Sequence, residues 1–295
     1  MPRLLARFAA VLCAAALLAS CGGGSSNSSN NFSVFVADGP IDQASSVVVS
    51  LTEIDVSGDQ GTFTFPFPES SPVNFYQLQG GLSQFLFQGT LPEGHYTSIT
   101  LYFDAPPGTL DSNITLIGNG NTLPLVIPAG QPTKITVPVN FIVFQNITAS
   151  YTLDLDLRRS VLPNPNDPNQ YILQPALRAV DNQNYGTITG TVANTLVSSG
   201  CAGAVYVYSG QVTPTDVNVN APAGSVQPIS SALVGINNTT GQFAFAVSFL
   251  PPGTYTAAFT CQADLDNPTT SDNIKFLSKT TATVQKGQTA FITLN

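Results

Sequence analysis

The chain has 295 residues, of which 43% are hydrophobic and only 9% are charged, and its formal net charge is −8. An average soluble domain has roughly 25% charged residues, so Asn, Ser, Thr and Gln must supply most of the polar surface, and the apolar fraction excludes disorder for the bulk of the chain. The shortage of Lys and Arg argues against a nucleic-acid partner, because phosphates are bound by clusters of basic side chains.

The first residues have the pattern of an export signal. Arg3 and Arg7 flank the start of an apolar run over residues 8–19. This run is too short to cross a bilayer, which needs about 20 apolar residues, and a basic region followed by a short apolar segment is typical of a cleaved signal peptide. We therefore predict that residues 1–20 are removed.

The segment Leu18-Ala19-Ser20-Cys21 resembles the lipobox of bacterial lipoproteins, in which the cysteine thiol receives a diacylglyceryl group before cleavage. The resemblance implies lipidation of Cys21 and attachment to a membrane through that lipid. Gly22 stands where an Asp would indicate retention in the inner membrane, so the outer membrane is the expected location. Residues 21–31, rich in Gly, Ser and Asn, are the predicted tether.

From residue 32 onward, alternation of apolar and polar residues predicts half-buried strands. Ile99, Leu101 and Phe103 alternate with polar residues, and residues 153–158 show the same pattern. Turn-forming residues separate these runs, and no amphipathic helix is expected after the signal peptide.

An internal repeat indicates two related halves. The segment 91–97, Leu-Pro-Glu-Gly-His-Tyr-Thr, recurs at 250–256 as Leu-Pro-Pro-Gly-Thr-Tyr-Thr, and segments 127–137 and 284–294 follow in the same order. The Leu-Pro-x-Gly-x-Tyr turn resembles those of prealbumin-like and carboxypeptidase-regulatory-like sandwich modules.

We therefore expect an all-β chain of two tandem antiparallel β-sandwich domains with an Ig-like or prealbumin-like fold. Their predicted limits are 32–182 and 186–295.

Five blocks of the first half are similar to a bacterial lipoprotein domain known as domain of unknown function 4382. The blocks are residues 34–56, 76–81, 91–96, 153–161 and 171–178. The resemblance implies an exported, usually lipidated, β-rich domain, and it brings no known activity.

The four cysteines are consistent with export. Cys13 leaves with the signal peptide and Cys21 carries lipid, so Cys201 and Cys261 are expected to form a disulfide in an oxidising compartment. The alternative, a metal or redox pair, lacks Cys-x-x-Cys spacing and a nearby histidine.

The arginines of the mature chain are Arg158, Arg159 and Arg178, and all are expected in the closing strands of the first domain, near Asp154 and Asp156. Asp154, Asp156, Arg158 and Arg178 are a candidate cluster. Paired hydrogen bonds between guanidinium and carboxylate groups favour an ion-pair network, and recognition of an anionic ligand is the alternative.

Catalysis is not expected. His95 is the only histidine, and Thr254 takes its place in the repeated turn. The sequence has no nucleophile elbow, phosphate loop, zinc signature or dinucleotide fingerprint, so we predict no enzyme and no cofactor.

Two further sets of residues are candidate ligand sites. Asp264, Asp266 and Asp272 offer oxygen ligands for Ca²⁺, but the spacing fits no EF-hand, so a solvated acidic loop is expected and no metal is predicted. Tyr206 and Tyr208 share one face of the predicted strand; core packing is expected there, and a sugar-binding platform is the alternative.

These observations predict a lipid-anchored cell-envelope lipoprotein that acts as a non-enzymatic binding or structural module. The expected partner is another envelope protein, engaged through loops or an exposed strand edge. The alternative is carbohydrate binding by the second domain, by analogy with other sandwiches.

Overall fold

A computed structural model describes residues 31–145 and 147–295. The predicted signal peptide, Cys21 and the tether up to residue 30 lie outside the described residues. Within the described part of the chain, no helix is long and apolar enough to cross a membrane.

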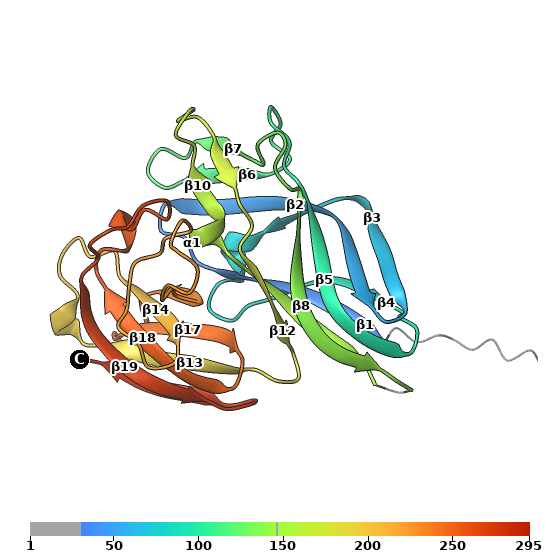
Figure 1. The fold of residues 1–295 in the computed structure, drawn as a ribbon. Coiled ribbons are helices and arrows are strands. Elements are labelled where there is room, and N and C mark those ends of the chain that lie inside the picture. The colour runs from blue at the N-terminus through green and yellow to red at the C-terminus, as the bar shows by residue number, and fades with distance from the viewer. Residues whose placement is uncertain (1–30, 146) are drawn as a thin grey trace, which may run out of the picture.

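The first half folds into two facing sheets (Figure 1). One sheet has the order β12-β9-β1-β4, with β1 (Phe32–Gly39), β4 (Gln84–Gly89), β9 (Ala149–Asp156) and β12 (Leu177–Asp181). The other has the order β10-β11-β7-β6-β2-β5-β8, with β3 paired to β2. Its strands are β2 (Ala44–Gly58), β3 (Gly61–Asn74), β5 (Gly94–Asp104), β6 (Asn113–Leu116), β7 (Thr122–Val126), β8 (Lys134–Val143), β10 (Val161–Pro163) and β11 (Tyr171–Leu173).

One continuous hydrophobic core fills the space between these sheets. It contains alternate residues of the strands, because successive side chains of a strand point to opposite faces. Among its fully buried members are Phe32, Leu51, Ile54, Tyr96 and Leu153. The 3-10 helix η1 (Phe75–Leu78) buries Phe75 and Leu78 in the same core.

The second half has two four-stranded sheets. The first has the order β16-β17-β13-β20, with β13 (Gly186–Val192), β16 (Gly235–Ile236), β17 (Phe243–Leu250) and β20 (Thr289–Leu294). The second has the order β15-β14-β18-β19, with β14 (Ala204–Ser209), β15 (Ser230–Leu233), β18 (Gly253–Thr260) and β19 (Phe276–Val284). Two 3-10 helices, η2 (Asn194–Leu196) and η3 (Ala263–Leu265), lie in its connections.

The predicted all-β sandwich class is confirmed, and most strand pairs are antiparallel as expected. Among the strands that the structure describes, three pairs are parallel: β1 with β9, β7 with β11, and β13 with β20. Two parallel neighbouring strands need a long crossover connection. Between β1 and β9, this connection includes strands of the facing sheet. The connection between β12 and β13 covers residues 182–185, and we keep 32–182 and 186–295 as the proposed domain limits.

The repeated turn has the same structure in both halves. Leu91 and Leu250 are buried in their respective cores. The Tyr96 hydroxyl donates to the Pro92 carbonyl oxygen at 2.9 Å, and the Tyr255 hydroxyl donates to the Pro251 carbonyl oxygen at 2.6 Å. The motif therefore buries a leucine and closes a turn with a tyrosine, which accounts for its recurrence.

One sequence prediction about local structure is wrong. The alternation over residues 153–158 predicts a strand through Arg158, but the chain leaves β9 and forms a single helical turn, α1 (Leu157–Ser160). The reason is a cap: the Asp156 carboxylate accepts a hydrogen bond from the Arg159 backbone N–H at 3.3 Å. A side chain that accepts from a free N–H favours the start of a helix over continuation of a strand.

The chain enters the first sandwich at one end of its long strands. The Asn31 N–H donates to the Gly89 carbonyl, and the Ala149 N–H donates to the Asn31 carbonyl. The Asn31 side chain also pairs with the backbone of Leu91, just before β5. The loops between β5 and β6 and between β6 and β7 lie at the opposite end of β2 (Figure 1).

Candidate functional site

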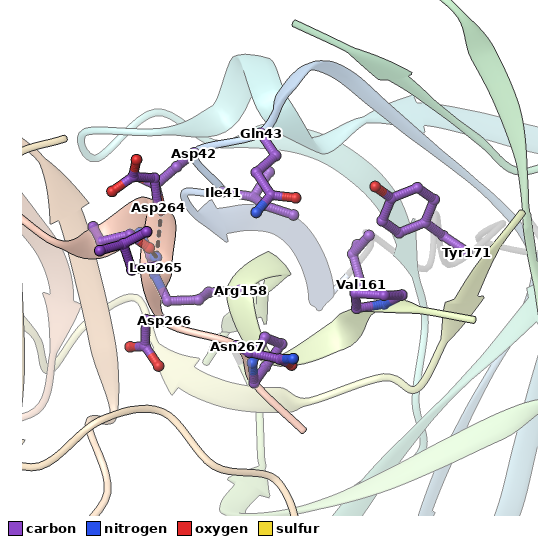
Figure 2. Close-up of a pocket in the computed structure, with 13 residues that line it drawn as sticks. Ile41, Asp42, Gln43, Arg158, Val161, Tyr171, Asp264, Leu265, Asp266 and Asn267 are labelled. Carbon is purple, nitrogen blue, oxygen red and sulfur yellow. Dashed lines mark hydrogen bonds and ion pairs between the residues drawn. The ribbon is translucent and has the colours of Figure 1, made fainter. Parts of the chain in front are cut away.

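The candidate site lies at the junction of the two sandwiches, around Arg158 (Figure 2). Helix α1 places this side chain, which is only 4% exposed, against η3 of the second sandwich. Arg158 Nη1 forms an ion pair with Asp42 and donates to the Ala263 carbonyl oxygen at 3.0 Å. The guanidinium carbon lies 5.1 Å from the centre of the Tyr206 ring, within range of a cation–π interaction. One side chain thus contacts a loop of the first sandwich and two elements of the second.

A small cavity adjoins Arg158. Its volume is about 130 Å³, and its polar lining includes Asp42, Gln43, Asp264 and Asp266. Pockets for drug-sized ligands have volumes of about 300–1,000 Å³, so this cavity suits water or one small polar group. Arg158 Nε and Nη2 have no hydrogen-bond partner among the described residues, and buried water commonly satisfies such groups.

Arg178 makes a second polar contact across the junction. It lies on β12 directly opposite Asp154 of β9, and the two side chains form an ion pair. Arg178 Nη1 also donates to the carbonyl oxygen of Phe249 on β17 of the second sandwich, at 2.5 Å. Phe249 has a φ of 56°, in the left-handed region that residues other than glycine seldom adopt. Both arginines therefore connect the two sandwiches.

An apolar contact accompanies these polar ones. Ala37 and Val180 of the first sandwich pack with Phe249 of the second in one buried cluster, and the half-buried Tyr185 lies against it. The Tyr185 and Phe249 ring centres are 5.0 Å apart.

The structure separates the four residues of the predicted cluster into different roles. Asp154 pairs with Arg178, whereas Arg158 pairs with Asp42, which the sequence did not bring into the cluster. Asp156 caps α1. Burial raises the pKa of the Asp156 carboxyl to about 6, against the opposing charge of Arg159.

Asp38, on β1, is a buried acid that the sequence did not single out. Neither of its carboxylate oxygens has a hydrogen-bond partner among the described residues. Burial, together with the negative charges of Asp154 and Asp156, raises its pKa well above the ordinary value. A protonated, neutral Asp38 fits this environment, because an isolated charge is expensive to bury. Asp38 stands two residues after Val36 and four after Val34, so it shares the face of β1 that these buried valines occupy.

The predicted disulfide is confirmed. Cys201 and Cys261 are bonded and close a loop with a sequence separation of 60 residues. The bond fastens the segment before β14 to the end of β18 in the second sandwich.

The other candidate residues lie apart from the junction cavity or in the core. His95 is near the opposite end of the first sandwich, where its Nε2 is 2.7 Å from Asn140 Oδ1. Tyr206 and Tyr208 are 0% and 1% exposed. A sugar must stack on an exposed ring, so these two tyrosines do not form a binding platform.

Three carboxylates could hold a metal ion. Asp216, Asp266 and Asp272 come together, with one oxygen of each within 4.8 Å of the others. Asp264, which the sequence placed with Asp266 and Asp272, is exposed and outside this group. The sequence missed Asp216 because it lies in a loop without periodicity, about fifty residues earlier.

Residues 29–175 match the model of a protein family described as Domain of unknown function (DUF4382). No curated protein is similar enough to the chain to count as a match.

Among solved structures, the minor pilin GBS52 of Streptococcus agalactiae is 11% identical, with 89% of this chain and 94% of that chain covered and a TM-score of 0.19. The fimbrial anchor protein Mfa2 of Porphyromonas gingivalis is 10% identical, with 84% and 81% covered and a TM-score of 0.18. At such TM-scores the likeness does not bear on function.

Proposed function

The chain belongs, through residues 29–175, to the DUF4382 family, and from this premise we propose that it is a lipid-anchored protein of the bacterial cell envelope. In this proposal the lipid is carried by Cys21, and the body is a non-enzymatic module that binds another envelope protein. The outer membrane is the proposed site of attachment.

The disulfide supports the proposed location. Cys201 and Cys261 are bonded, and structural disulfides persist in oxidising compartments outside the cytoplasm. The export signal read from residues 1–20 is consistent with such a compartment.

The observation that carries the proposed arrangement is the position of Asn31. This residue is fixed at one end of the first sandwich by hydrogen bonds to Gly89 and Ala149. Cys21 lies only ten residues earlier in the sequence. A lipid at Cys21 would therefore keep the Asn31 end close to the bilayer and leave the opposite loops directed away from it.

The Asn31 end carries exposed apolar side chains. Ile142, Phe144 and Ile147 are 62%, 57% and 51% exposed. They lie at the end of β8 and in the connection to Ala149, the partner of Asn31, and the Ile147 N–H donates to the Phe144 carbonyl oxygen. We call these three residues the apolar tip. An apolar surface beside a lipid anchor suits contact with the bilayer.

The opposite end is the proposed partner surface. Leu110, between β5 and β6, and Ile117, between β6 and β7, are 55% and 58% exposed. Loops displayed on a rigid sandwich commonly carry binding residues. No observation on the described residues favours carbohydrate binding, since Tyr206 and Tyr208 are in the core.

Two experiments test this proposal. Cys21→Ser should release the protein from the membrane fraction and remove the lipid mass from the processed N-terminal peptide. A photo-crosslinking amino acid at Ile117 should give a reproducible adduct with one envelope protein in living cells, whereas the same group at Ile236 of the second sandwich, 61% exposed, should not. Unchanged fractionation would refute the anchor, and equal labelling from both positions would refute the partner surface.

A further inference from the structure

Two loops of the second sandwich bring three carboxylates together. Asp216 belongs to the connection between β14 and β15, whereas Asp266 and Asp272 belong to the connection between β18 and β19. The loops are joined directly, because the Asp272 N–H donates to the Asp216 carboxylate and the Val219 N–H donates to the Pro268 carbonyl oxygen at 2.8 Å. The relative positions of the carboxylates are therefore fixed by the fold.

The three carboxylates concentrate negative charge where little of their surface is exposed to solvent. Asp216 and Asp266 are 8% and 5% exposed, and Asp272 is half-buried. Arg158 is a nearby cation, but it is already paired with Asp42. The negative charge of buried carboxylates that lie this close together must be neutralised, either by a bound cation or by bound protons.

An unpartnered oxygen provides a second, separate observation. Asp266 Oδ2 accepts from the Tyr206 hydroxyl at 2.6 Å and from the Val217 N–H at 3.2 Å. Asp266 Oδ1 is buried and has no hydrogen-bond partner among the described residues. A buried oxygen without a partner costs free energy, and this one belongs to the carboxylate grouped with Asp216 and Asp272. The Asp266 carboxylate therefore keeps an unused acceptor.

The spacing of the carboxylate oxygens fits Ca²⁺. Ca²⁺ binds oxygen at about 2.3–2.6 Å, so two oxygens on opposite sides of one ion are up to about 5 Å apart, whereas the shorter bonds of Mg²⁺ limit this distance to about 4 Å. The oxygens of Asp216, Asp266 and Asp272 lie within 4.8 Å of one another. Hard carboxylate oxygens are the preferred ligands of Ca²⁺.

We propose that Asp216, Asp266 and Asp272 form a calcium site that fastens the two loops of the second sandwich to each other. The site does not depend on the lipid anchor or on the partner surface. It differs from the acidic loop that the sequence predicts, because Asp216 takes the place of the exposed Asp264.

The test is calcium titration calorimetry on the full chain in detergent, after treatment with chelator and its removal. One Ca²⁺ should bind per chain, with a Kd of about 10⁻⁴–10⁻³ M, as in extracellular modules. Mg²⁺ should bind at least about tenfold more weakly, because its geometry is stricter. The melting temperature should rise with calcium and fall on adding chelator.

Matched variants locate the site. Asp272→Asn and Asp216→Asn should weaken calcium binding by about tenfold or more, since each removes a charged ligand. Asp264→Asn, in the same loop but exposed, should bind like the wild type. If Asp216→Asn fails to fold, as judged by near-ultraviolet circular dichroism, the half-buried Asp272→Asn decides alone.

Two results would overturn the proposal. One is an absence of binding at millimolar calcium combined with greater thermal stability of Asp272→Asn, which would show that protons neutralise the group. The other is equal loss of binding in Asp264→Asn and Asp272→Asn, which would indicate diffuse attraction to an acidic loop.

Discussion

Arg158 of the first sandwich donates to the Ala263 carbonyl oxygen of the second at 3.0 Å, across 105 residues of sequence. The same guanidinium pairs with Asp42 and lies over the Tyr206 ring. Its aliphatic stem and charged head are both buried. Because the contacts of one buried cation extend to both sandwiches, Arg158 should couple their unfolding.

Arg158→Ala should uncouple the sandwiches. Removing one partner of a buried ion pair commonly costs about 3–5 kcal/mol, and here the loss falls on the junction. Urea unfolding followed by both intrinsic fluorescence and circular dichroism should change from one transition to two. Arg159→Ala, which alters the next residue on the same helical turn, is the control and should keep a single transition. A single, unshifted transition in Arg158→Ala would contradict the assigned role.

Asp156→Asn should stabilise the protein at neutral pH. The folded pKa of about 6 lies above the ordinary value of 3.8, so between these values the folded state binds more protons than the unfolded state. Stability therefore falls as pH rises through this window, and the cost is complete above about pH 6. Asparagine cannot ionise, yet its side-chain oxygen can still accept from the Arg159 N–H.

The expected gain for Asp156→Asn is about 1–2 kcal/mol at pH 7, because one pKa unit corresponds to about 1.4 kcal/mol and the side chain is only partly buried. Urea unfolding across the acid range should show the variant and the wild type converging near pH 4. The exposed Asp111→Asn should follow the wild-type curve. A constant difference at every pH would mean that the cap, and not the ionisation, sets the effect.

The repeated turn predicts parallel effects in the two halves. Tyr96→Phe and Tyr255→Phe each remove one hydroxyl that donates to a proline carbonyl. A hydrogen bond of this kind contributes about 1 kcal/mol, so each variant should lose about that much stability, with additive losses in the double variant because the sites are far apart. A strongly non-additive double variant would show that the turns communicate through the junction.

Loss of the disulfide should destabilise the second sandwich. A bond that closes a loop with a separation of 60 residues typically contributes about 2–4 kcal/mol, mainly by restricting the unfolded chain. The double variant Cys201→Ala and Cys261→Ala should therefore unfold at lower urea, and the wild type under reducing conditions should match it. If reductant destabilised the double variant as well, the effect would not come from this bond.

Local patterns were sufficient for the strands and the repeated turn. Alternation placed Ile99, Leu101 and Leu153 in the core, and the tyrosine of the repeated motif closes both turns. These features depend on residues close in sequence, which is why periodicity and turn chemistry could predict them.

The contacts at the junction could not be predicted from local sequence patterns. Arg158 pairs with Asp42, 116 positions earlier in the chain, and that pairing depends on how whole sheets pack. The helical turn that presents Arg158 has only four residues, too few for a helical period to show in the sequence. Asp216 likewise lies close to Asp266 only because the β14–β15 and β18–β19 loops are hydrogen-bonded to each other.

The apolar tip should bind lipid without the anchor. In a Cys21→Ser background, co-sedimentation with neutral phosphatidylcholine vesicles should detect weak binding, because the acidic chain would be repelled by anionic lipid. Burial of one large apolar side chain contributes about 1.5–3 kcal/mol, so replacing Phe144 and Ile147 together by serine should reduce vesicle binding by about tenfold or more. The matched control replaces Phe291 and Ile236, which are 68% and 61% exposed on the second sandwich. Equal losses from both pairs would indicate non-specific adsorption, whereas loss from the tip alone would place the Asn31 end against the bilayer.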